Sequence, residues 1–183
     1  MNRLLKILWP LSVATLVIQA IYYHPLLSER IASHFDLKGN PDGWSSKESF
    51  FVLWYLMIVF LNVWVPLVGV LVRKLPPSMV NIPHREYWLA TEGRKAHVRD
   101  VVFVMMAGIF TGVNVILAMV FHQLARFNLG QSPRADGNII WVILPVVMAF
   151  AIAYPLVAFR VKEEDGEGYP GQKRDPVRRK RDV

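Results

Sequence analysis

The sequence predicts an all-α integral membrane protein in which four transmembrane helices form one bundle. Four long apolar runs contain no Lys, Arg, Asp or Glu, and they occupy residues 7–23, 50–72, 101–124 and 139–159. A helix needs about 20 mostly apolar residues to cross the hydrocarbon core of a bilayer. Charged residues are concentrated between the runs, which indicates that lipid is the solvent. We therefore expect residues 1–162 to form one four-span membrane domain.

The distribution of basic residues predicts the orientation of the bundle. The N-terminus, the second connection and the C-terminal tail carry two, six and eight Lys or Arg residues, whereas the first and third connections carry three and two. Cytoplasmic segments of membrane proteins are enriched in Lys and Arg. We therefore expect both termini to be cytoplasmic and the first and third connections to lie outside. This location accounts for the net charge of +7, so we expect no nucleic-acid partner.

The two ends of the chain are interpreted separately. Arg3 and Lys6 precede an apolar run as in a secretory signal, but the run has no small-residue cleavage site, so we interpret it as a retained first span. Residues 163–183 are first acidic and glycine-rich and then basic, a composition typical of disorder. We expect them to form a disordered, charged cytoplasmic tail that is attracted to anionic lipids.

A short extracytoplasmic turn or hairpin is expected between the first and second spans. Residues 30–37 are compatible with a short strand, and residues 38–44 are rich in Gly, Pro, Asn and Asp, which favour turns. Ser45 and Glu48 have the spacing of a capping box, in which each side chain accepts a hydrogen bond from a free backbone N–H. This pair predicts the start of the second helix.

Spans two and three contain residues with structural consequences. Pro66 is expected to kink the second span, because proline removes a helical hydrogen bond. Residues 81–89 predict a short interfacial helix that leads into the third span. In that span Gly108 and Gly112 form a small-x-x-x-small pattern, which lets two helices approach closely. This face would permit a homo-oligomer.

Asn62 and Asn114 are the sharpest polar signal within the spans, since each lies close to the midpoint of its run. An amide in hydrocarbon needs a partner, and equal depth would allow these two to bond each other. Gln19 and Thr111 could extend such a network. Two interpretations stay open, namely adhesion between helices and a path for a polar substrate. The lack of Asp, Glu, Lys and Arg in the four runs weighs against a proton-coupled pump.

The expected outer side collects the residues that could bind a ligand. The candidate ligand-binding residues are His34, Asp36, Asn40, Asp42 and Trp44. Imidazoles and carboxylates can hold zinc, and two further histidines (His24 and His122) lie on the same side, but the spacing matches no common metal motif. The chain has no cysteine, no Gly-x-Ser-x-Gly elbow and no phosphate-binding glycine loop. We therefore expect no metal, no cofactor and no catalytic residue.

The second connection holds the densest cluster of polar and aromatic residues on the expected cytoplasmic side. Its members are Asn81, Pro83, His84, Arg85, Glu86, Tyr87 and Trp88. Aromatic rings and basic groups both favour anionic headgroups, so the cluster could anchor the chain to membrane lipids. The alternative is a docking site for a soluble cytoplasmic regulator.

Two segments resemble a family of bacterial membrane proteins known as domain of unknown function 1648 (DUF1648). Residues 31–47, IASHFDLKGNPDGWSSK, resemble the defining segment of the family, and residues 81–90, NIPHREYWLA, resemble the motif that commonly follows its second span. The resemblance covers about residues 7–124. It departs at residues 27–28, Leu-Ser, where family members often have a proline. A distantly related member, larger than this chain, gives immunity to the sporulation-delaying toxin and holds a repressor at the membrane.

The resemblance implies a bacterial cytoplasmic (inner) membrane protein with a non-enzymatic role in sensing, immunity or signalling. The outer residues would then meet an extracytoplasmic peptide, toxin or other ligand, and the cytoplasmic motif would bind lipid or a regulator. A small oligomeric transporter or permease component that uses Asn62 and Asn114 is the first alternative. A membrane metalloenzyme with its metal at the outer histidines is the second.

Overall fold

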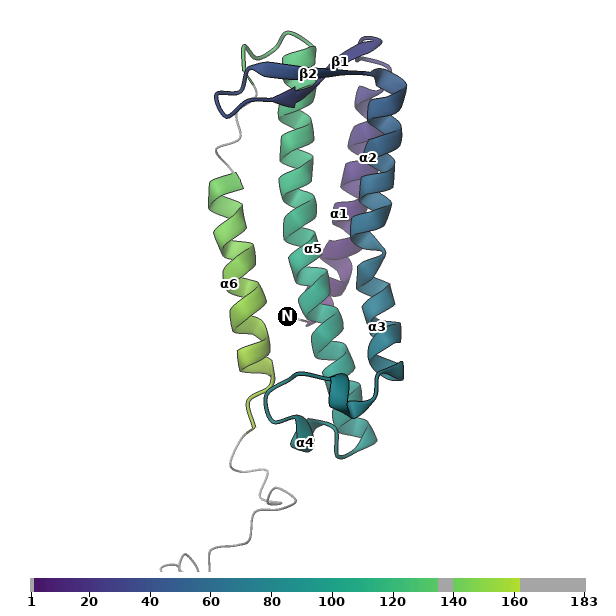
Figure 1. Ribbon diagram of the computed structural model, residues 1–183, viewed down its shortest axis with the longest axis vertical. Helices are drawn as coiled ribbons and strands as arrows, with labels where there is room; N and C mark the ends of the chain where they lie inside the picture. The colour runs from purple at the N-terminus through teal and green to yellow at the C-terminus, as the bar shows by residue number, and fades with distance from the viewer. Residues whose placement is uncertain (1, 135–139, 162–183) are drawn as a thin grey trace, which may run out of the picture.

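The computed structural model describes residues 2–134 and 140–161, and it shows long helices side by side with a small β-hairpin across one end of the bundle (Figure 1). The long helices are α1 Asn2–Tyr23, α2 Lys47–Asn62 continued by α3 Trp64–Lys74, α5 Glu92–Asn128 and α6 Ile140–Ala158. The first connection contains strands β1 Arg30–Phe35 and β2 Pro41–Ser46. The second contains the 3-10 turn η1 Pro77–Met79 and the one-turn helix α4 Arg85–Trp88.

We call the end of the bundle that carries the strands the hairpin end, and the opposite end the α4 end (Figure 1). The tail that the sequence predicts to be disordered, 163–183, lies outside the described residues, as does residue 139.

Among the described residues, four helical segments are long and apolar enough to cross a membrane: Arg3–Tyr23, Lys47–Val72, Glu92–Asn128 and Ile140–Ala158. Only 11–22% of the apolar window of each segment is buried inside the protein. Most of the apolar surface therefore faces outward, and an apolar surface of this extent requires a hydrocarbon solvent. The predicted fold class, a multi-pass all-α membrane protein with four spans, is confirmed.

Helix α5 is the central element of the bundle, because it contacts α1, α3, α4, α6 and β1. Its buried side chains recur at intervals of three or seven residues, apart from one adjacent pair, at Val98, Val101, Val104, Ala107, Asn114, Phe121, Leu124 and Ala125. This spacing gives one continuous stripe along a helix. With 37 residues, α5 is about 55 Å long, more than the roughly 30 Å of a hydrocarbon core. It therefore links the two ends of the molecule.

The beginning of α5 differs from the sequence prediction, which placed the third span at 101–124. The helix starts nine residues earlier, at Glu92, and Thr91 caps it by accepting a hydrogen bond from the N–H of Arg94 at 3.3 Å. The segment 92–100, which is rich in charged residues, therefore continues the helix beyond the apolar run. The prediction missed this extension because apolar run length indicates the part of a helix in hydrocarbon and not the part in the headgroup layer.

The second span is interrupted at Val63, between α2 and α3. Pro66 has no N–H to donate to the carbonyl of Asn62 four residues earlier, so the helical hydrogen-bond ladder lacks one member there. Val63 itself keeps right-handed helical dihedral angles (φ −60°, ψ −26°), and its N–H bonds the Val59 carbonyl at 2.9 Å. The interruption lies at the place where the sequence predicts a proline kink.

The two glycines of the third span pack against α6 of the same chain. A Cβ added to Gly108 would lie 2.3 Å from the Phe150 ring, and one added to Gly112 would lie 2.2 Å from a methyl group of Val147. The close helix approach that the small-x-x-x-small pattern predicts therefore occurs within the chain. Helix α6 occupies this face, and a homo-oligomer through Gly108 and Gly112 stays a prediction.

Candidate binding sites at the two ends of the bundle

The hairpin is held between its own cross-strand bonds and the helices beneath it. Its strands pair antiparallel, with Arg30 opposite Ser46 and Phe35 opposite Pro41, and the register is irregular between Ala32 and Phe35. Ile31 is fully buried in the apolar cluster at the hairpin end. The strands therefore lie across the end of the bundle, with one face packed against the helices.

The start of α2 differs by one residue from the predicted capping box. Ser46, and not Ser45, is the N-cap, and its hydroxyl accepts a hydrogen bond from the N–H of Ser49 at 3.2 Å. The Ser45 hydroxyl is buried without a hydrogen-bond partner. Because Ser46 is also the last residue of β2, the strand passes directly into the helix, and this constraint moves the cap by one position.

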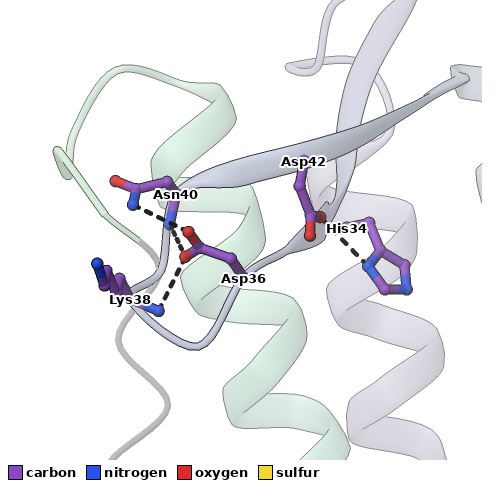
Figure 2. Close-up of polar contacts among 5 residues, drawn as sticks. All are labelled: His34, Asp36, Lys38, Asn40 and Asp42. Atoms are coloured by element: carbon purple, nitrogen blue, oxygen red, sulfur yellow. Dashed lines mark hydrogen bonds and ion pairs between the residues drawn. The ribbon is translucent and has the colours of Figure 1, made fainter.

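The turn of the hairpin is organised by the carboxylate of Asp36. Its Oδ1 atom accepts hydrogen bonds from the backbone N–H groups of Lys38 and Asn40, both at 2.8 Å, and its Oδ2 atom accepts one from the Asn40 side-chain amide at 3.1 Å (Figure 2). Gly39 adopts a positive φ of 79°, which the turn requires and glycine allows at no steric cost. Two predicted ligand-binding residues, Asp36 and Asn40, are therefore engaged with each other.

These hydrogen bonds lower the pKa of Asp36 below its usual value of 3.8, with the Asn40 backbone N–H as the largest cause and its side-chain amide as the second. A carboxyl whose folded pKa is depressed stabilises the fold above the unfolded pKa and loses this contribution as pH falls through the folded pKa. We expect the turn to persist at pH 3.8 and to open only as the pH falls through the lowered pKa of Asp36. In Asn40→Ala the Asp36 pKa should rise toward 3.8, as followed by NMR of the carboxyl carbon in micelles. An unchanged pKa in that variant would mean that the side-chain amide contributes nothing.

A second group of predicted residues is exposed on the strands, apart from the Asp36 group (Figure 2). His34 Nδ1 lies 3.3 Å from Asp42 Oδ1, with 81% of the histidine side chain and 52% of the aspartate side chain exposed. Trp44 is 51% exposed, and the Arg30 guanidinium lies 5.5 Å from the centre of its ring. The strands thus present an imidazole, a carboxylate and an indole to the surroundings.

An interaction that the sequence does not reveal fixes the hairpin to α5. The side-chain amide of Asn128 accepts a hydrogen bond from the N–H of Ala32 at 2.8 Å and donates one to the Ala32 carbonyl at 3.0 Å. One amide thereby satisfies both backbone groups of one strand residue, as a neighbouring strand would. Phe127 adds an edge-to-face contact with Phe35, with ring centres 5.0 Å apart. The last turn of α5 is therefore bonded to β1.

The histidines and aspartates that the sequence predicts to lie outside do not converge on one point. Among residues 2–134 and 140–161, no group of three or more His, Cys, Asp or Glu side chains is arranged to hold a metal ion. His24 packs against the Phe51 ring, with ring centres 4.6 Å apart, and His122 shares a 2.9 Å hydrogen bond with the Tyr23 hydroxyl. Of these four residues, His34 and Asp42 lie next to each other.

In the middle of the bundle, Asn62 and Asn114 form a reciprocal amide pair. Each Nδ2 donates to the other residue's Oδ1, at 3.1 and 2.9 Å, and the two residues are 7% and 1% exposed. From α1, the Trp9 indole donates to Asn62 Oδ1 at 2.9 Å, and the Ser12 hydroxyl accepts from Asn114 Nδ2 at 2.9 Å. The network joins α1, α2 and α5.

The hydrogen-bonding capacity of Asn62 is fully used. Its two amide hydrogens go to Asn114 and to the Ile58 carbonyl at 3.0 Å, and its oxygen accepts twice. Gln19 and Thr111 do not join this network: Gln19 donates to the Ala118 carbonyl at 3.0 Å, and Thr111 donates to the Ala107 carbonyl at 2.7 Å. These contacts favour adhesion between helices over a substrate path.

At the α4 end the predicted cytoplasmic cluster divides into an inward and an outward half. Tyr87 is only 7% exposed, and the Arg94 guanidinium lies 3.8 Å from the centre of its ring. The Trp88 ring stacks on His97, with centres 4.8 Å apart, and its indole N–H donates to the Phe159 carbonyl at 3.2 Å. These two rings attach α4 to α5 and to the end of α6.

The outward half faces an open cavity of about 320 Å³, lined by Val80, Asn81, Ile82, His84, Arg85 and Glu86. His84 adopts a left-handed conformation with φ 53°, which is costly for a residue with a Cβ. Pro83, in the turn before it, is exposed. The backbone thus turns sharply at His84, and the residues on either side of the turn present a basic, an acidic and an amide group.

Comparison with known protein families identifies one segment of the chain. Residues 11–61 match the family described as Domain of unknown function (DUF1648). The matched range contains most of α1, the whole hairpin and all of α2 except its last residue, so the predicted resemblance to DUF1648 is confirmed there. No curated protein and no solved structure matches. The resemblance to the immunity protein of the sporulation-delaying toxin stays a prediction.

Proposed function

We propose that this multi-pass membrane protein with a DUF1648 segment is a non-enzymatic sensor, immunity or signalling protein. It binds an extracytoplasmic peptide, toxin or similar ligand on its hairpin and relays the event through α5 to a soluble regulator at the α4 end. The observation that carries this proposal is that α5 contacts both candidate sites. Asn128 bonds β1 at one end, and Arg94 and His97 contact the α4 rings at the other.

The hairpin supports the first half of the proposal. His34, Asp42 and Trp44 are exposed and belong to strands whose position is fixed from below. An exposed tryptophan beside hydrogen-bonding groups is typical of protein-binding surfaces. A basic or amide-rich peptide segment would find a carboxylate, an imidazole and an indole within one short hairpin.

The α4 end supports the second half. Asn81, His84, Arg85 and Glu86 line the cavity with groups of both charges, whereas Tyr87 and Trp88 attach this surface to α5. A shift of α5 would therefore move the cavity wall with it. The excess of Lys and Arg in the second connection supports a cytoplasmic location for this end, and with it the proposal that the hairpin lies outside the inner membrane of a bacterial cell.

Photo-crosslinking in native membranes tests the proposal. A probe at Trp44 should capture a secreted peptide, and a probe at Glu86 should capture a soluble protein. Glu86 is preferred to its neighbour Tyr87 because Tyr87 is buried against Arg94. The matched control is a probe at Val142, an exposed residue of α6, which should capture only lipid. Capture of lipid and of the chain itself at both test positions would refute the proposal.

Substitution of His34 or Asp42 by alanine should abolish ligand capture at Trp44 without lowering the amount of protein in the membrane. Both side chains are exposed, so little packing is lost, and their pairing is the feature that a ligand would replace or extend. Lys38→Ala, on the exposed turn, is the matched control and should retain capture. If membrane abundance fell in parallel with capture, these residues would serve folding.

A further inference from the structure

A second cavity, of about 190 Å³, lies at the α4 end between α3, the segment around η1 and the first turns of α5. It is lined by Val72, Leu75, Val80, Leu89, Glu92, Lys95, Val98 and Arg99. The apolar lining residues come from α3, from the second connection and from α5, whereas all three charged residues come from α5. The cavity therefore has an apolar wall and a charged wall.

The cavity lies at the level where hydrocarbon gives way to headgroups. The second membrane-spanning segment ends at Val72, which lines the cavity, and the third apolar run begins at Val101, just beyond Val98 and Arg99. A membrane protein normally presents basic side chains at this depth to the phosphate layer. The depth and the divided lining fit a molecule that is apolar on one side and charged on the other.

The charged wall has a net charge of +1. Lys95 and Arg99 are four residues apart, so they lie on one face of α5. The Lys95 ammonium lies 2.7 Å from a Glu92 carboxylate oxygen, which fixes the lysine at the rim of the cavity. Two cations and one carboxylate suit a ligand with a single negative charge. A doubly charged phosphate monoester would be repelled by Glu92.

We propose that this cavity binds the headgroup of a membrane phospholipid. The phosphodiester lies between Lys95 and Arg99, and the glycerol and first acyl carbons lie against Val72, Leu75 and Val98. This site adjoins the cavity of His84 and Arg85, since Val80 lines both, but its charged residues are different ones. It does not depend on the proposed sensing role. Its occupant enters sideways from the bilayer, since a lipid is the one phosphodiester that the surrounding membrane supplies at this depth.

Native mass spectrometry of the full chain in detergent, titrated with phosphatidylglycerol, tests the assignment. Lys95→Gln/Arg99→Gln should weaken binding of the first phospholipid about thirtyfold, because each basic group that pairs with the bound phosphate contributes roughly a fivefold factor. Lys74→Gln/Arg160→Gln removes the same charge from exposed positions outside the cavity lining and should change binding less than about threefold. Diacylglycerol, which has no phosphate, should not bind.

Two results would overturn the assignment. One is equal phospholipid binding by the cavity variant and the control variant. The other is full displacement of phosphatidylglycerol by excess inorganic phosphate, which would identify the occupant as a free anion from solution. Circular dichroism of each variant verifies that the helices are intact before binding is compared.

The variant Glu92→Gln provides an independent test, because it keeps both Lys95 and Arg99. Removing the carboxylate raises the net charge of the lining to +2, so phosphatidic acid, a lipid phosphate monoester, should bind about fivefold more tightly. Phosphatidylglycerol should gain much less, because its single charge is already matched. An equal gain for both lipids, or none for either, would exclude a phosphate contact at this wall.

Discussion

Asn114→Leu should lower the free energy of unfolding by about 2 kcal/mol, since the side chain makes three hydrogen bonds in the bundle and such bonds are worth roughly 0.6–1.7 kcal/mol each in membranes. Leucine has the same branched arrangement of side-chain heavy atoms but leaves the Asn62 amide with a hydrogen and a lone pair unpaired in an apolar interior. The measurement is a denaturant titration in mixed micelles, followed by circular dichroism.

The matched control is Thr111→Val on the same helix. The Thr111 hydroxyl donates only to the Ala107 carbonyl of its own helix, so its loss should cost under about 0.5 kcal/mol. If the two variants lost equal stability, the asparagine pair would have no special role in adhesion. If Asn114→Leu folded normally but abolished flux of a polar solute into vesicles, the transporter alternative would replace the sensor proposal.

The second large effect is expected at the contact between α5 and α6. Gly112→Ala should destabilise the protein by about 1–3 kcal/mol, because the new methyl group would lie 2.2 Å from a Val147 methyl group and the helices would have to separate. The same micelle titration measures this loss. Gly93→Ala, at the exposed start of α5 with no atom within 4 Å of the new Cβ, is the control and should be neutral or slightly stabilising.

A rescue variant makes this prediction specific. Val147→Ala removes the methyl groups that Gly112→Ala would meet. The double variant should therefore lose about 1 kcal/mol less free energy of unfolding than the two single variants lose in sum. Strict additivity would show that the destabilisation arises elsewhere. A contradicting outcome is a wild-type dimer that Gly112→Ala disrupts while the stability of the monomer is unchanged. That result would identify this face as an interface between two copies of the chain.

The fold is predictable from the sequence because run length, depth and turn composition are local properties. The asparagine pair follows from the same reasoning, since two amides at equal depth in hydrocarbon have few other partners. The clamp between Asn128 and Ala32 is not predictable in this way. It joins residues 96 positions apart, and an asparagine at a helix end is also a common C-terminal residue with no tertiary role.

The candidate sites were predictable as segments but not as surfaces. The sequence predicts five outer-loop residues as one ligand-binding group, yet two of them, Asp36 and Asn40, bond each other, and the other three, His34, Asp42 and Trp44, are exposed. In the same way, residues 81–88 separate into rings that face α5 and polar groups that line a cavity. Composition shows which groups are present, but which side they face depends on strand register and on the turn at His84.

The interruption at Val63 gives the second span unequal mechanical properties along its length. Helix α2 contacts α1, both strands and, through Asn62, α5, whereas α3 contacts α5 near the α4 end. The missing hydrogen bond at Pro66 therefore separates α2, which contacts the hairpin, from α3, which leads into the second connection. Bending of the second span is therefore expected at the interruption, where Asn62 is the last residue of α2. We expect a load on the hairpin to bend the second span near Val63 and not to tilt it as one straight helix.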